Sequence, residues 1–130
     1  MTRGEKNNNP TNIRHVIGTT WVGQSDTQTD DAFVQFTDPT YGIRACARIL
    51  KSYQLEGLLT LSEIIDRWAP PNENNSLAYV TDVCNRCELE PDDPVNYQTS
   101  MPGIIKGIIW HENGECIYTD AQIEQGVSLA

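Results

Sequence analysis

The chain has 130 residues, of which 38% are hydrophobic and 21% are charged, as is ordinary for a soluble globular protein. Its net charge of −9 argues against DNA or RNA binding, because a phosphate backbone requires clustered Lys and Arg. No apolar run is long enough to span a bilayer, and the polar start MTRGEKNNNPTN carries no signal peptide. We therefore expect one domain over residues 1–130, made in a cytoplasm, with no membrane insertion.

The first part of the chain is predicted to be mostly irregular. Residues 1–30 are polar and rich in Asn, Gly and Thr, with room for two short strands. The alternating segment AFVQF, Ala32–Phe36, is typical of a strand or of an extended approach to a helix. Asp38 is a good N-cap and Pro39 a good first helical residue, so a helix is expected to follow. Its apolar face consists of Ile43, Cys46, Ala47, Leu50 and Tyr53.

The remainder of the chain predicts four more helices. Gly57 ends the helix before it, and Thr60 with Glu63 forms a capping box in front of a new apolar stripe. Ser100 and Pro102 are expected to start the helix that ends at residue 112. The four helices are expected over residues 61–68, 77 to about 87, 100–112 and 120–129, with a loop over residues 72–76. The predicted fold is mainly α (α+β), with about five helices, short β segments and one hydrophobic core.

The cysteines pose the question of a metal or redox site. Cys84 and Cys87 form a C-x-x-C pair, which suits half of a zinc site or a redox pair. No second pair accompanies it, because Cys46 and Cys116 stand alone, and YVTDVCNRC has the apolar stripe of a helix. We predict reduced cysteines packed in the core. With only two histidines, no metal or other cofactor is expected; metal binding and a cysteine–histidine nucleophile are the less favoured interpretations.

The segment IIWHENGEC places a carboxylate at the end of an apolar helix. Ile104, Ile105, Ile108 and Glu112 fall at i, i+1, i+4 and i+8, so they share the helix face that should be buried. Apolar neighbours and the negative end of the helix dipole both favour a protonated carboxyl, which a general acid needs. A half-buried Glu beside a cleft therefore suits glycoside cleavage. The alternative is a structural Glu that bonds the backbone or His111.

Glu5 is the rival acid. It stands four residues before Asn9–Pro10, and the pattern E-x-x-x-N-P resembles the catalytic stretch of lytic transglycosylases. Because only four residues precede Glu5, the sequence predicts that no helix holds it and that no apolar neighbour removes it from water. The alternative is a solvated side chain without a function.

Amide and aromatic side chains suggest a sugar-binding surface. NNNPTNIR is dense in Asn, whose amides suit hydroxyl and N-acetyl groups, although Asn near Pro also builds structural loops. Aromatic rings stand beside polar amides in WVGQ and WAPPNEN; Trp21 falls on a loop, whereas Trp68 falls in a helical stripe and is expected in the core. The candidate substrate-binding residues are Asn9, Asn12, Trp21, Gln24, Asn74 and Tyr79.

Five blocks follow one another along nearly the whole chain. They are RGEKNNNPTNIR, WVGQ, FVQFTDPTYGIRACARILKSYQ, IIDRWAPPNENNSLAYVTDV and IIWHENG. In this order they resemble a family of phage and prophage proteins described as virion structural or lysozyme-like proteins. The resemblance implies a phage-encoded protein that acts at the cell wall or in the virion.

A weaker resemblance is to bacterial peptidoglycan glucosaminidases of the lysozyme-like superfamily. NNPTNIR, Trp21, FVQFTDPTYGI and WAPPNENNSLAY match its later motifs in order, but the helix that ends in the catalytic Glu is missing from the front. A similar helix, GIIKGIIWHENG, stands at the back, with Asn113 where Ser would be expected. The resemblance therefore implies a lysozyme-like fold in circularly permuted order, with Glu112 as the acid and Glu5 at the rim of the same cleft.

These observations predict cleavage of the glycan strand of peptidoglycan, with Glu112 as general acid. A second carboxylate for hydrolysis is not obvious, and Glu73 and Asp26 are the nearest candidates. Without one, the sugar's own hydroxyl would attack, as in lytic transglycosylases. The expected partners are peptidoglycan glycan and other virion proteins.

Two other functions stay open. The first is a non-catalytic virion or glycan-binding component with the same fold; the sequence pI of about 4.5 favours it, because many wall lysins are basic. The second is a phage-encoded inhibitor of a basic host protein, which would use the acidic residues Glu90, Asp92 and Asp93.

Overall fold

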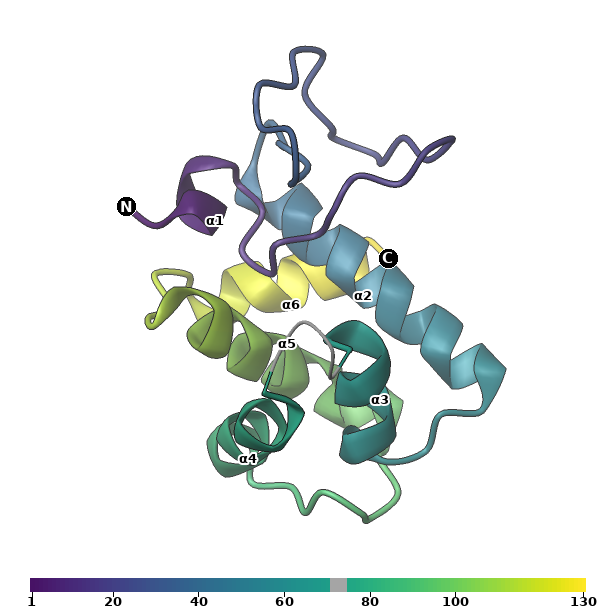
Figure 1. The fold of residues 1–130 in the computed structure, drawn as a ribbon. Helices are drawn as coiled ribbons and strands as arrows, with labels where there is room; N and C mark the ends of the chain where they lie inside the picture. The colour runs from purple at the N-terminus through teal and green to yellow at the C-terminus, as the bar shows by residue number, and fades with distance from the viewer. Residues whose placement is uncertain (71–74) are drawn as a thin grey trace.

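The computed structural model describes residues 1–70 and 75–130, and six α-helices account for most of this part of the chain (Figure 1). The helices are α1 (Arg3–Lys6), α2 (Pro39–Glu56), α3 (Leu61–Trp68), α4 (Ser76–Cys87), α5 (Tyr97–Asn113) and α6 (Asp120–Ser128). The described residues contain isolated β-bridges instead of strands, so the predicted short β segments are reduced to single paired residues. The prediction of a mainly α fold is confirmed.

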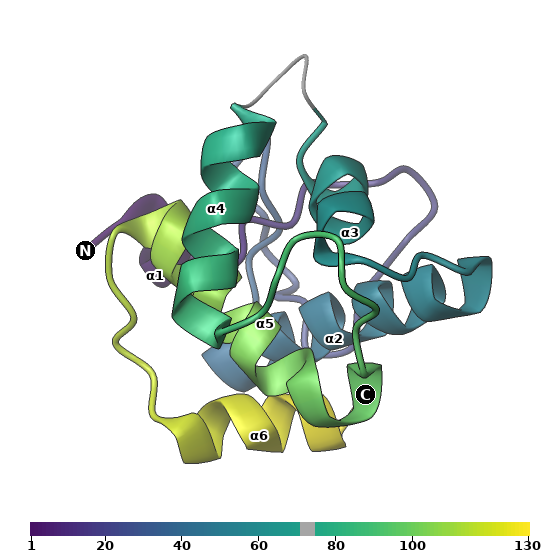
Figure 2. The same cartoon turned by 90° about the horizontal axis from the view of Figure 1, so that it is seen from below.

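Helix α5 lies at the centre of the molecule. It packs against α1, α2, α4 and α6, and Figure 2 shows it between α4 and α6. Its isoleucines explain this position, because Ile104, Ile105, Ile108 and Ile109 are all 0% exposed. Burying such side chains stabilises a fold by about 1.5–3 kcal/mol each. The predicted apolar face of this helix is thus the centre of the core.

Local capping signals set most helix ends. The Asp38 side chain accepts the Thr40 backbone N–H at 2.9 Å, and Gly57 closes α2 in the left-handed conformation with φ 87°. The capping box of Thr60 with Glu63 is present at the start of α3. These ends follow the sequence prediction, because each is decided by residues within one helical turn.

Two helix starts differ from the prediction. Helix α5 begins at Tyr97 and not at Ser100, because the Asn96 side chain accepts the backbone N–H groups of Gln98 and Thr99 and caps the helix earlier. Pro102 consequently lies inside the helix. Helix α1 was not predicted at all; it is a single turn, closed by a capping box between Thr2 and Glu5.

A long irregular segment, residues 7–38, joins α1 to α2 and rises over the N-terminal half of α2 in Figure 1. Gly42 permits its close approach, because a Cβ atom there would lie 2.4 Å from the Asn8 carbonyl oxygen. The segment thereby brings Asn12 and Arg14 next to helices that are distant in sequence.

Within the described residues, every helix is too short or too polar to cross a membrane.

Candidate active site

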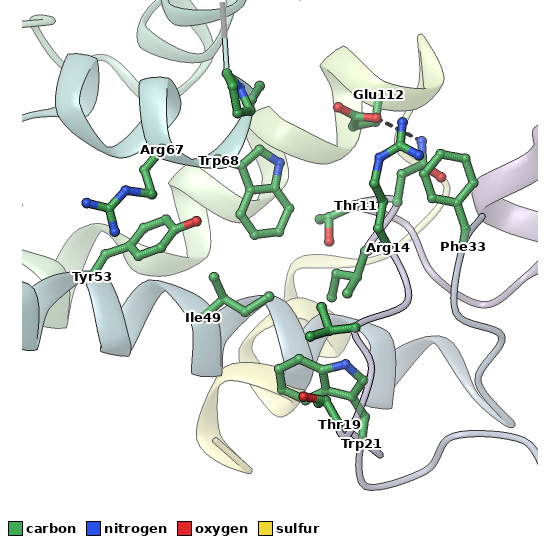
Figure 3. A pocket seen from close by; sticks show the side chains of 15 residues that line it. Thr11, Arg14, Thr19, Trp21, Phe33, Ile49, Tyr53, Arg67, Trp68 and Glu112 are labelled. Atoms are coloured by element: carbon green, nitrogen blue, oxygen red, sulfur yellow. Dashed lines mark hydrogen bonds between the residues drawn. The ribbon is translucent and has the colours of Figure 1, made fainter. Parts of the chain in front are cut away.

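A pocket of about 540 Å³ opens between the 11–21 segment, α2, the end of α3 and the end of α5 (Figure 3). This volume lies within the range of pockets that bind small ligands. Its aromatic lining residues are Trp21, Phe33, Tyr53 and Trp68. Its charged lining residues, in the described part of the chain, are Arg14, Arg67 and Glu112. The pocket therefore combines flat apolar surfaces with one carboxyl group.

Both carboxyl oxygens of Glu112 are held by side chains from distant segments. Asn12 donates its amide N–H to Oε1 at 2.8 Å, and Tyr79 donates its hydroxyl to Oε2 at 2.7 Å. The Glu112 side chain is half-buried at the C-terminal end of α5. Hydrogen bonds to a carboxylate are about twice as strong as those between neutral groups. Glu112 is therefore fixed in position at the wall of the pocket.

Tyr79 holds Glu112 but does not line the pocket. Its side chain is 1% exposed, in α4, and its ring lies 3.8 Å from the His111 ring, measured between centroids. His111 Nδ1 in turn lies 3.0 Å from Asp82 Oδ2. Burial, together with the Glu112 charge, raises the pKa of Tyr79 far above its ordinary value. The hydroxyl consequently stays protonated and remains a donor to Glu112.

Asn12 and Asn9 are both candidate sugar-binding residues, but the structure gives them different surroundings. Asn12 lines the pocket with its backbone in the left-handed conformation, φ 55°, which Asn tolerates better than most residues. Asn9 does not line it and is 0% exposed. The Asn9 amide donates to the carbonyls of Ile13 and Val34 and accepts the Ile13 N–H, each at 2.9 Å. Asn9 thus shapes the loop that carries Asn12.

Trp21 and Gln24 form a local pair. Trp21 lines the pocket and packs partly against the core. Gln24 lies outside the lining and accepts the Trp21 backbone N–H with its side chain at 3.1 Å. Trp68, expected in the core, packs against the core and also lines the pocket.

Glu5 requires a correction, because the structure contradicts the expectation of a solvated residue outside any helix. It lies in α1, is 4% exposed, and does not line the pocket. The hydrogen bond from the Thr2 backbone N–H, 2.9 Å to Oε1, lowers the pKa of Glu5. Glu115 takes the opposite shift: its pKa is raised, because its protonated carboxyl hydrogen-bonds to Glu5 and its charged form is repelled by Glu5. Glu5 therefore caps a helix beside a second acid, away from the pocket.

The other candidate residues lie elsewhere. Asn74 and Glu73 fall outside the described residues. Asp26 is exposed and is not part of the pocket lining. Glu112 is consequently the one carboxylate that lines the pocket within residues 1–70 and 75–130.

Sequence reasoning missed Arg14 and Phe33, which form one wall of the pocket. Their backbones are joined by an isolated antiparallel bridge, and the Arg14 guanidinium carbon lies 4.9 Å from the centroid of the Phe33 ring. No spacing pattern could have paired them, since 18 intervening residues without regular structure separate them.

The cysteines are free thiols in the structure. Cys46 and Cys84 are buried, whereas Cys87 and Cys116 are half-buried. Burial raises the pKa of Cys46 to about 12. Among the residues that the structure describes, no group of three or more His, Cys, Asp or Glu side chains is arranged to hold a metal ion.

Comparison with known proteins places the chain beside a phage protein. No family model matches the chain. Protein P5 of Pseudoalteromonas phage PM2 is 39% identical to it over 127 residues, which cover 95% of this chain and 79% of the relative.

Proposed function

We propose that this chain, which belongs to the family of Protein P5 of Pseudoalteromonas phage PM2, is a phage-encoded enzyme that cleaves the glycan strand of peptidoglycan. The observation that carries the proposal is Glu112, a carboxyl group fixed by two hydrogen bonds at the wall of an aromatic pocket. A phage must pass its host's wall, so such an activity suits a phage protein family. The proposal includes a lysozyme-like ancestry in permuted order.

The lining of the pocket supports a sugar as substrate. Trp21 and Trp68 offer flat apolar surfaces of the kind on which a sugar ring packs, and Asn12 and Thr11 add polar groups beside Glu112. In this proposal Asn12 and Trp21 contact the glycan directly. Asn9 and Gln24 act indirectly, because they hold the loop that carries those two residues. Asn74 keeps its proposed role as a sugar contact, although it lies outside the described residues.

In the proposed mechanism one carboxyl group acts first as acid and then as base. Protonated Glu112 gives its proton to the glycosidic oxygen as the bond from that oxygen to the anomeric carbon breaks. A hydroxyl of the same sugar attacks the anomeric carbon, and its proton passes to the Glu112 carboxylate. The step forms an anhydro sugar, consumes no water and regenerates the acid.

This mechanism fits a pocket with one carboxylate better than hydrolysis does. Hydrolytic glycosidases use a pair of carboxylates, and Glu112 alone lines the pocket in the part of the chain that the structure describes.

Digestion of purified peptidoglycan followed by mass analysis tests the proposal. We expect anhydro-muramyl ends from the native chain. Glu112→Gln should lower the rate by about 10²–10⁴-fold, the usual contribution of general acid catalysis. Glu124→Gln, at an exposed carboxylate on α6, is the matched control and should cleave at the native rate. New reducing ends instead of anhydro ends would show hydrolysis, and equal rates for the Glu112 variant and the native chain would refute the role of Glu112.

A second candidate function is a non-catalytic, glycan-binding virion component. One observation favours it: the bonds to Asn12 and Tyr79 also make Glu112 a structural tie between the 11–21 segment, α4 and α5. This candidate predicts binding to peptidoglycan without anhydro or reducing ends. It also predicts that Glu112→Gln lowers the thermal stability of the protein and leaves no activity to lose.

A further inference from the structure

The arginines around the pocket differ in whether an acidic residue pairs with them. Arg3 is held by Asp30 through two hydrogen bonds of 2.7 Å, and Arg67 is paired with Glu56. Arg14 makes no ion pair with any acidic residue in the described part of the chain. In a protein with a net charge of −9, this leaves a local positive charge at the wall of the pocket.

Arg14 is also held in a defined place. Its backbone pairs with Phe33, and its guanidinium lies over the Phe33 ring. Among the described residues, Arg14 is tied by this cation–π contact and by no ion pair, so its N–H edges remain available to an acceptor. Those edges match the two oxygens of a carboxylate, which Arg binds in a bidentate manner. In Figure 3, Arg14 and Phe33 lie on the side of Glu112, while Tyr53 and Arg67 lie on the other side of Trp68.

We infer that Arg14 binds a carboxylate of the substrate and so selects muramic-acid-containing glycan over uncharged polymers of N-acetylglucosamine. The inference rests on the proposed function and assigns the substrate class of the same pocket. Two sources can supply the carboxylate: the lactyl group of a muramic acid without peptide, or the stem peptide attached to it. Anchoring at Arg14 would place the muramic acid beside Glu112, where the glycosidic oxygen must lie.

A carboxylate-binding Arg at the pocket is useful to this protein because its overall charge is negative. The peptidoglycan strand carries carboxylates, and a protein of charge −9 gains nothing from long-range attraction to it. Arg14 is exposed at the wall of the pocket, but at the short range of a bidentate contact with a bound carboxylate salt screens its charge less than it screens long-range attraction. Selection for the charged sugar is therefore made in the pocket and not on approach.

Binding titrations of the full chain test the inference with three probes. They are a chitin-type disaccharide, a peptide-free disaccharide of N-acetylglucosamine and N-acetylmuramic acid, and the same disaccharide carrying its stem peptide. Arg14→Gln should weaken binding of at least one carboxylated probe by about 10-fold or more, the loss of a hydrogen-bonded charge pair. Its binding of the chitin-type disaccharide should change less than about two-fold, a shift of only a few tenths of a kcal/mol. The carboxylated probe that loses affinity identifies the source of the carboxylate.

Two further variants make the result specific. Arg48→Gln removes the same charge from an exposed position of α2 outside the pocket lining and should leave all three affinities unchanged. Arg14→Lys keeps the charge but loses the planar fork, so it should restore part of the lost affinity. Thermal unfolding of each variant identifies any loss of fold.

Several results would overturn the inference. They are equal losses for charged and uncharged probes in Arg14→Gln, unchanged affinities in that variant, or no binding of any probe by the native chain. The outcome is separate from that of the proposed function. A chain that shows Arg14-dependent selection without cleaving peptidoglycan supports the inference and refutes the enzyme. A chain that cleaves without such selection refutes the inference alone.

Discussion

Replacing Tyr79 with Phe removes one oxygen atom and tests whether Glu112 is held as the structure shows. The Tyr79 hydroxyl donates to Glu112 Oε2 at 2.7 Å, and the ring is 1% exposed, so Phe fills the same space without a cavity. The substitution leaves a half-buried carboxyl oxygen without its donor. The substitution should therefore lower the stability of the fold and leave Glu112 less firmly held in the pocket.

The size of the effect follows from the kind of bond. A hydrogen bond to a charged group stabilises a fold by about 1.5–3 kcal/mol, and one between neutral groups by about 0.5–1.5 kcal/mol. An unfolding entropy of about 2.1 cal/mol/K per residue means that each kcal/mol shifts Tm by about 4 °C in a chain of 130 residues. Tyr79→Phe should thus lower Tm by about 6–11 °C.

Calorimetry of Tyr79→Phe beside Tyr97→Phe provides the measurement. Tyr97 donates its hydroxyl to the neutral Leu58 carbonyl at 2.7 Å, so Tyr97→Phe removes the same atom and should lower Tm by only about 2–6 °C. The double variant with Glu112→Gln should show a coupling free energy of about 0.5–3 kcal/mol between the two positions. A Tm drop no larger than that of Tyr97→Phe, together with zero coupling, would refute the claim that Tyr79 stabilises a charged Glu112.

Two further predictions concern groups outside the pocket. The pKa of Glu115 is raised in the folded chain by Glu5, so the folded state is penalised at neutral pH and relieved below the unfolded pKa of about 4.3. Glu115→Gln should therefore raise Tm at pH 7, with a smaller gain near pH 3.5; a lower Tm at pH 7 would contradict the repulsion between the two acids. Burial raises the pKa of Cys46 to about 12, so a thiol reagent at pH 8 should modify Cys46 only after unfolding. Peptide mass analysis measures the labelling. Modification of Cys46 in the native protein as fast as that of a free thiol would contradict this prediction.

Much of the helical framework was predictable from the sequence, because its signals act over one turn. The N-cap at Asp38, the glycine at Gly57 and the capping box at Thr60 mark ends that the structure confirms. The start of α5 shows where such signals compete. Pro102 suggested a late start, but Asn96 satisfies two backbone N–H groups earlier in the chain.

The surroundings of the candidate residues were less predictable. Glu5 and Asn9 were assigned to a cleft from residue type and spacing, and both prove to be buried away from the pocket. Polar side chains in a short loop can face either water or the chain's own backbone, and the sequence carries no sign of which will occur. The difference is decided by whether a neighbouring segment covers them.

The sequence by itself determined a mainly helical chain with a buried isoleucine face and a carboxylate, Glu112, at the end of that face. Only the tertiary structure decided what meets that carboxylate: Asn12 and Tyr79 lie 100 and 33 residues away from it. Arg14 and Phe33 likewise come together only through a bridge between two irregular segments. Hydrophobic periodicity and caps are local properties of a chain, whereas a pocket is made from contacts between distant segments, which form only once the core has packed.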